Sequence, residues 1–89
     1  MSWRLTFSRN AQKSLRRLPP DTRRRLDRTF AEMAQDPLSG DVAVLKDYPV
    51  GYRRRVGPYR VLFDIDQATR NVQVQEVERR TSTTYRRRR

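Results

Sequence analysis

Arg53, Arg54 and Arg55 are consecutive arginines, and Arg60 follows them after a short turn. Because side chains alternate along a strand, we expect Arg53 and Arg55 to share one face. Arg60 should come close to them on the paired strand, since directly opposed side chains lie about 4.5–5.5 Å apart. Guanidinium groups bind phosphate oxygens bidentately and stay charged at any working pH. We therefore predict a phosphate-binding surface, with a solvated strand face as the alternative.

Further candidates lie near the C-terminus. Tyr85 could stack on a base, or donate or accept a proton beside arginines. Glu76 and Glu78 are possible general bases, although simple ion pairing with the nearby Arg79 and Arg80 is the favoured explanation for both. The run Arg86–Arg89 is compatible with a nucleic-acid arm, a protein contact or a plain tail.

The composition excludes several classes of site. The 89 residues include 21 basic and 10 acidic side chains, a net charge of +11, and neither histidine nor cysteine. A disulfide scaffold, the usual zinc sites and Ser-His or Cys-His catalysis are therefore excluded, and we expect neither a metal nor a cofactor. The charge predicts a polyanionic or acidic partner.

The chain length fits one domain, which we place at residues 1–85, with a basic tail at 86–89. Its apolar stretches are only a few residues long, and no signal peptide is visible at the N-terminus. We therefore expect a cytoplasmic protein that makes no membrane contact.

The hydrophobic pattern predicts the elements that position these residues. Residues 2–7 alternate as a strand. Ser8 is placed to cap a short helix that ends at Pro19-Pro20, and the apolar spacing of Leu26, Phe30 and Met33 indicates a second helix ending before Pro37. Residues 36–50 resemble a connector that Val42, Val44 and Leu45 could anchor to the core.

Three strands follow in the second half, at 51–56, at 59–65 and around Val72, Val74 and Val77. Their very short connections require antiparallel neighbours. The predicted fold is α+β, in the order β-α-α-β-β-β: a small antiparallel sheet of about four strands, with an N-terminal helical hairpin packed on one face.

The chain resembles the RelE/ParE toxin superfamily over nearly its whole length. The resemblance is carried by residues 3–8, by Ala11, Leu15 and Leu18, and most specifically by the run Gly51 to Phe63, which contains R-x-R-V-G-x-Y-R-V. Val77, Arg80, Tyr85 and Arg86 support it. The superfamily fold agrees with the element order predicted above.

The RelE branch, which the basic residues favour, implies a type II toxin that cleaves mRNA on the ribosome. The 2′-OH attacks the adjacent phosphate, and an antitoxin with an acidic segment wraps the toxin and neutralises it. The resemblance assigns catalysis to Arg53, Arg55, Arg60, Arg80 and Tyr85, and we assign RNA contacts to Arg54, Arg79, Arg86 and Arg87. Counting back from Tyr85 selects Arg79 in place of Arg80 as the catalytic arginine.

The chain departs from the family pattern in ways that bear on mechanism. Arginine replaces lysine at Arg53 and Arg55, and arginine cannot act as a base. Proton transfer would then pass to Tyr85, to a carboxylate or to ribosomal groups, while the arginines stabilise charge on the phosphate. Two alternatives remain open: a ParE-like toxin that inhibits gyrase, and an inactive basic module that binds RNA or the antitoxin.

Overall fold

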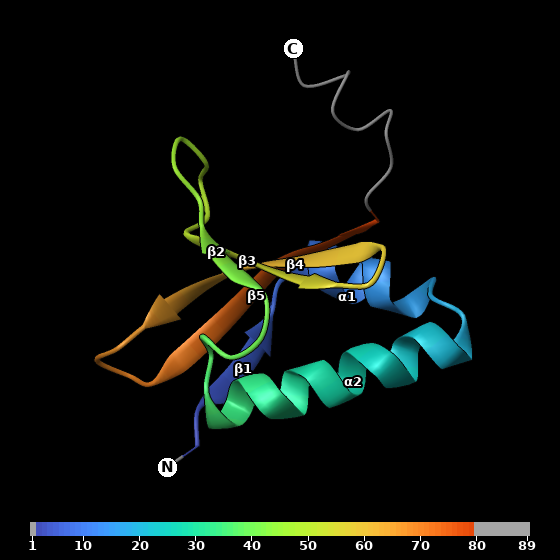
Figure 1. Ribbon diagram of the computed structural model, residues 1–89, viewed down its shortest axis with the longest axis horizontal. Coiled ribbons are helices and arrows are strands. Elements are labelled where there is room, and N and C mark those ends of the chain that lie inside the picture. The colour runs from blue at the N-terminus through green and yellow to red at the C-terminus, as the bar shows by residue number, and fades with distance from the viewer. Residues whose placement is uncertain (1, 80–89) are drawn as a thin grey trace.

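The computed structural model describes residues 2–79 and contains two helices and five strands in one sheet (Figure 1). In chain order the elements are β1 (Arg4–Phe7), α1 (Arg9–Arg16), α2 (Pro20–Gln35), β2 (Val42–Val44), β3 (Tyr52–Val56), β4 (Tyr59–Asp66) and β5 (Asn71–Arg79). No helix in this part of the chain is long and apolar enough to cross a membrane.

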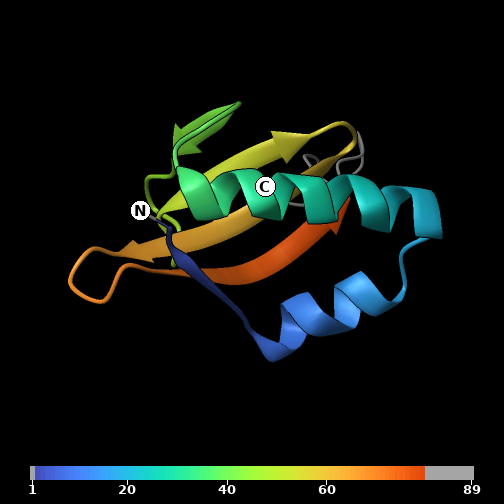
Figure 2. The ribbon, with the colours of Figure 1, turned by 90° about the horizontal axis from the view of Figure 1, so that it is seen from below.

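The strands are arranged in the order β1-β5-β4-β3-β2, and both helices lie on the same side of the sheet (Figures 1 and 2). β2 to β5 pair antiparallel, as their short connections require. The predicted α+β fold and its element order are confirmed. Within residues 2–79 the other side of the sheet carries no helix, so the two faces have different surroundings.

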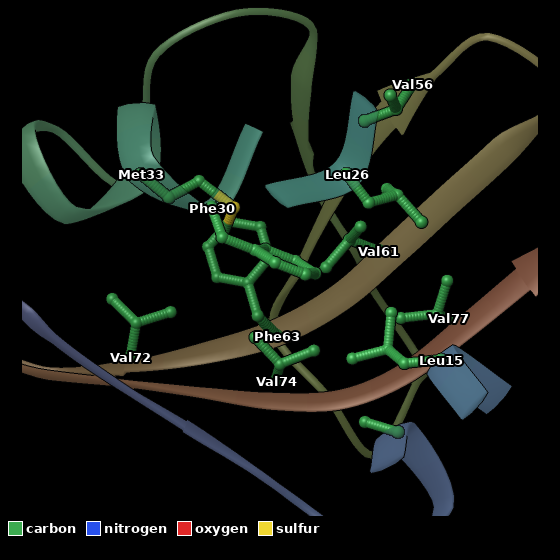
Figure 3. Close-up of a cluster of buried hydrophobic side chains, with 11 residues drawn as sticks. Leu15, Leu26, Phe30, Met33, Val56, Val61, Phe63, Val72, Val74 and Val77 are labelled. Carbon is green, nitrogen blue, oxygen red and sulfur yellow. The ribbon is translucent and has the colours of Figure 1, made fainter. Parts of the chain in front are cut away.

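The core lies between the helices and the sheet (Figure 3). Leu26, Phe30 and Met33 of α2 meet Val61 and Phe63 of β4 in one buried cluster. The 3.6-residue period of the helix and the two-residue period of the strand bring these apolar side chains to one interface. Burying each such side chain contributes about 1.5–3 kcal/mol.

Ser8 links the start of α1 to an irregularity in β5. Its hydroxyl oxygen accepts a hydrogen bond from Ala11 N at 3.0 Å, which is the predicted cap, and donates to Gln75 O at 2.6 Å. Gln75 is the extra residue of a β-bulge, because Val74 pairs with Phe63 while Glu76 pairs with Leu62. The bulge returns Val77 to the core side. It therefore explains why Val72, Val74 and Val77 all face the core although they are two and then three residues apart.

The structure differs from the expected fold in three details. Residues 42–44, expected within a connector, form β2 at the edge of the sheet, a strand too short to be recognised by its period. β1 pairs parallel with β5 at the edge of the sheet opposite β2, whereas an antiparallel sheet was expected. Val44 does not anchor the core: it is 69% exposed, whereas Val42 packs against the core.

Candidate nucleic-acid interface

Arg53, Arg55 and Arg60 share the helix-free face of the sheet, and we call them the arginine cluster. Arg55 pairs directly with Arg60 across β3 and β4, and Arg53 lies two residues before Arg55 on the same strand. The Gly57-Pro58 turn between the two strands fixes this register. The predicted convergence of Arg53, Arg55 and Arg60 is thus present in the sheet pairing.

Two carboxylates partly neutralise the cluster. Asp41 approaches Arg53 Nη1 at 3.5 Å and Arg55 Nε at 3.9 Å, and Asp41 is more than half exposed. Glu78 Oε1 accepts a shorter hydrogen bond from Arg60 Nε, at 3.0 Å. The pair of Asp41 with Arg55 is long and joins two exposed side chains, so it contributes little stability. Arg55 can therefore exchange Asp41 for a phosphate at little cost, whereas the Arg53 side chain is only 15% exposed.

Arg60 is the most buried member of the cluster, with 9% of the residue exposed. Within residues 2–79 its Nη2 is buried and has no hydrogen-bond partner, which leaves one end of the guanidinium unsatisfied. Leu62, also on this face and 4% exposed, adds an apolar surface between Arg53 and Glu76. An anion oxygen that reaches Nη2 after a rearrangement of this side chain would meet a donor in surroundings of low polarity, which strengthen electrostatic interactions.

Arg54 lies on the opposite, helix-facing side, and its side chain is 9% exposed. Its Nη2 donates to Glu32 Oε1 at 2.7 Å, and its Nη1 donates to Ser39 O at 3.0 Å. The contacts join β3 to the end of α2 and the loop after it. This placement corrects the predicted RNA contact and gives Arg54 a structural role, because its guanidinium lies on the helix-facing side and is held by Glu32 and Ser39.

Arg79 also lies on the helix-facing side of the sheet, where it pairs with Tyr59. Its guanidinium carbon is 5.9 Å from the centre of the Tyr59 ring, within cation–π range. Arg79 is therefore separated from the arginine cluster by the sheet. Of the remaining predicted site residues, Arg80, Tyr85, Arg86 and Arg87 lie outside the described residues.

Asp41 is the residue of this face that the sequence did not reveal as important. It precedes Arg53 by twelve positions and reaches the cluster because β2 pairs with β3, where Asp41 O also accepts a hydrogen bond from Arg55 N at 2.9 Å. The available signal was the short apolar run Val42–Val44 directly after it. Read as an edge strand, this run would have carried Asp41 towards the arginines.

The arrangement suits binding and electrostatic stabilisation of a phosphodiester. Three guanidinium groups on one face can contact several phosphate oxygens and stabilise charge that develops on them. The carboxylate of Glu78 lies within the same surface and can accept a proton. Across residues 2–79 there is no group of three or more acidic, histidine or cysteine side chains arranged to bind a metal ion.

Comparisons with known proteins agree with this architecture. No curated protein is significantly similar in sequence. The RelE–RelB complex from Pyrococcus horikoshii matches with a TM-score of 0.80 at 23% identity, covering 92% of this chain and 99% of that chain. RelBE2 from Mycobacterium tuberculosis matches with a TM-score of 0.78 at 24% identity, covering 90% and 100%.

The isolated RelE toxin of Escherichia coli matches with a TM-score of 0.77 at 22% identity, over 98% of this chain and 95% of that chain. At these identities the matches establish the fold. The family model of the ParE toxin of the type II toxin–antitoxin system, parDE, matches residues 5–82, most of the chain. The chain therefore belongs to the ParE toxin family of type II toxin–antitoxin systems.

Proposed function

We propose that this toxin is a ribosome-dependent endoribonuclease that cleaves mRNA in the cytoplasm, with the arginine cluster as its phosphate-binding surface. The observation that carries the proposal is the pairing of Arg55 with Arg60 on the helix-free face, together with the unsatisfied Nη2 of Arg60. A buried guanidinium nitrogen without a partner is costly, and at Arg60 it lies on the face that also carries Arg53 and Arg55. A phosphate oxygen supplies the missing acceptor.

The reaction is attack by the 2′-oxygen of one nucleotide on its own 3′-phosphate. The 2′-hydroxyl gives its proton to a base, the bond from phosphorus to the 5′-oxygen breaks, and the 5′-oxygen takes up a proton. The products are a 2′,3′-cyclic phosphate and a 5′-hydroxyl. Arg53 and Arg55 orient the phosphate, while Arg60 stabilises the additional negative charge in the transition state.

Proton transfer requires a group other than the arginines, which remain protonated. We assign proton transfer to Tyr85, to a carboxylate such as Glu78, or to a ribosomal group. Arg80 is proposed as a further catalytic residue beside Arg53, Arg55 and Arg60. Dependence on the ribosome follows if the ribosome supplies or positions such a group. Arg86 and Arg87 add RNA contacts.

The proposed regulator is an antitoxin. RelE proteins of the same fold have been crystallised with RelB antitoxins. An acidic antitoxin segment would occupy the arginine cluster in place of RNA, since carboxylates and phosphates bind guanidinium groups in the same way.

The test uses purified protein added to ribosomes programmed with a defined mRNA. We expect cleavage at the A-site codon, reduced about 10²- to 10³-fold by Arg60→Ala, as for loss of one transition-state donor. Tyr85→Phe should also reduce cleavage. Arg28→Ala, which removes an exposed arginine from α2, is the control with the same change in charge and should retain activity.

A gyrase supercoiling reaction run in parallel tests the second candidate, a gyrase-inhibiting toxin, which the ParE family match favours. Intact mRNA together with inhibited supercoiling would overturn the ribonuclease proposal in favour of this candidate. If neither activity is found while the antitoxin still binds, the chain is an inactive basic module.

A further inference from the structure

The exposed face of α1 carries only positive charge. Arg9, Lys13, Arg16 and Arg17 recur at one-turn spacing on the side of the helix opposite the buried Ala11 and Leu15, and all four are exposed. We call these four residues the basic α1 face. In residues 2–79 none of them forms an ion pair.

The neighbouring helix has a different charge pattern. On α2, Arg23 pairs with Asp27 and Arg24 pairs with Asp21, so its exposed arginines are partly balanced. No acidic residue precedes Asp21 in the sequence, and α1 therefore has no partner on its own element. The basic α1 face is thus an uncompensated surface, separate from the general positive charge of the chain.

The charge pattern has opposing effects on the helix, because Lys13 and Arg16 in the last turn are favourably placed for the helix dipole. Arg9 lies in the first turn, where the helix dipole favours negative charge. Lys13 lies four residues from both Arg9 and Arg17, and like charges at this spacing destabilise a helix by about 0.2–0.5 kcal/mol per pair. A bound polyanion would remove both of these penalties, so the arrangement suits binding.

Geometry separates this surface from the arginine cluster. α1 packs on the helix-covered side of the sheet, whereas Arg53, Arg55 and Arg60 lie on the other side (Figure 2). One phosphate group cannot contact both surfaces. From Arg9 to the C-cap residue Arg17 the helix axis extends about 12 Å, so the four cations form a row that suits a chain of phosphates better than a single small anion.

We propose that the basic α1 face binds the phosphate backbone of a base-paired RNA, while the arginine cluster holds the single strand that is cleaved. The exposed residues of α1 include no aromatic side chain, so the helix offers no platform for stacking unpaired bases. Contacts to the backbone alone are typical of recognition of double-stranded RNA. The choice of RNA as the polyanion rests on the proposed function, whereas the position of the surface does not.

The test measures binding to a base-paired 2′-O-methyl RNA hairpin, which lacks the 2′-hydroxyl needed for cleavage. Lys13→Gln with Arg17→Gln removes two charges from the basic α1 face. Arg24→Gln with Lys46→Gln removes two exposed charges elsewhere and is the matched control. We expect the α1 variant to weaken binding about tenfold at physiological salt and to reduce the salt slope by about 1.8. The control should change affinity less than about twofold.

Equal weakening by both variants would overturn the proposal, because it would show a response to net charge alone. The same holds if the α1 variant loses affinity for poly-glutamate but keeps its affinity for the hairpin. A single-stranded 2′-O-methyl RNA provides the converse test: Arg55→Gln should weaken its binding, whereas the α1 variant should not. An unchanged or higher melting temperature of the α1 variant excludes unfolding as the cause.

This experiment separates the two proposals. If hairpin binding depends on α1 but mRNA is not cleaved on ribosomes, the basic α1 face is supported as an RNA-binding surface and the ribonuclease proposal is overturned. If mRNA is cleaved but hairpin binding does not depend on α1, the ribonuclease proposal is supported and the proposal for the basic α1 face is overturned.

Discussion

Arg60 and Glu78 face each other across β4 and β5, with Nε and Oε1 3.0 Å apart, on the side of the sheet that carries no helix. The β-bulge at Gln75 produces this relationship, because it shifts the register of β5 by one residue after Val74. Strict alternation from Val72 and Val74 would have placed Glu78 towards the core. The bulge thus places Glu78 as the counter-ion of Arg60 in the arginine cluster.

Replacing this carboxylate should raise the affinity of the cluster for anions. In Glu78→Gln the guanidinium of Arg60 loses its charged partner, so a phosphate no longer competes with a resident carboxylate. We expect single-stranded 2′-O-methyl RNA to bind several-fold more tightly, and stability to fall by about 1 kcal/mol. Anisotropy titration and urea denaturation measure the two effects. Unchanged affinity would show that Glu78 does not compete with the phosphate.

Arg54 should matter for stability and not for RNA binding. Arg54→Met keeps much of the side-chain volume but removes the hydrogen bonds to Glu32 and Ser39. Because Glu32 is largely exposed and remains solvated, we expect a loss of about 2 kcal/mol of unfolding free energy. The matched variant Arg55→Met should keep its stability and lose RNA affinity. An RNA-binding defect in folded Arg54→Met would contradict this assignment.

Two glycines with positive φ should respond differently to alanine. A Cβ at Gly40 would lie 2.6 Å from Arg54 Nε, in a guanidinium fixed by Glu32 and Ser39. A Cβ at Gly57 would meet the end of Arg25, which is exposed and can move away.

We therefore expect Gly57→Ala to cost about 1 kcal/mol, from backbone conformation alone, and Gly40→Ala to cost at least about twice as much. Urea denaturation of the two variants provides the comparison. Equal losses would show that Arg54 rearranges as freely as Arg25.

Ser8→Ala should destabilise the protein through both contacts of the hydroxyl. The variant loses the cap on Ala11 N and leaves Gln75 O at the bulge without its donor. We expect a loss of about 1–2 kcal/mol, measured by urea denaturation. Ser8→Thr, which keeps the hydroxyl, should restore most of the stability. If Thr and Ala lose the same amount, the hydrogen bonds of Ser8 do not account for the effect.

The local pattern of the sequence was sufficient to predict the common face of Arg53, Arg55 and Arg60. Strand alternation and a tight turn are properties of neighbouring residues, and they do not depend on the rest of the chain. The same holds for the cap at Ser8 and for the apolar faces of both helices. The roles assigned to Arg80 and Tyr85 come from family resemblance and stay predictions.

Contacts between distant parts of the chain were decided only by the tertiary structure. Asp41 joins the arginine cluster because β2 pairs with β3, and Glu78 joins it because a bulge changes the register of β5. Arg54 is buried because α2 ends above β3 and presents Glu32 to it. Each of these outcomes depends on strand register and helix packing, which arise from the summed burial of many side chains and not from the type of the residue concerned.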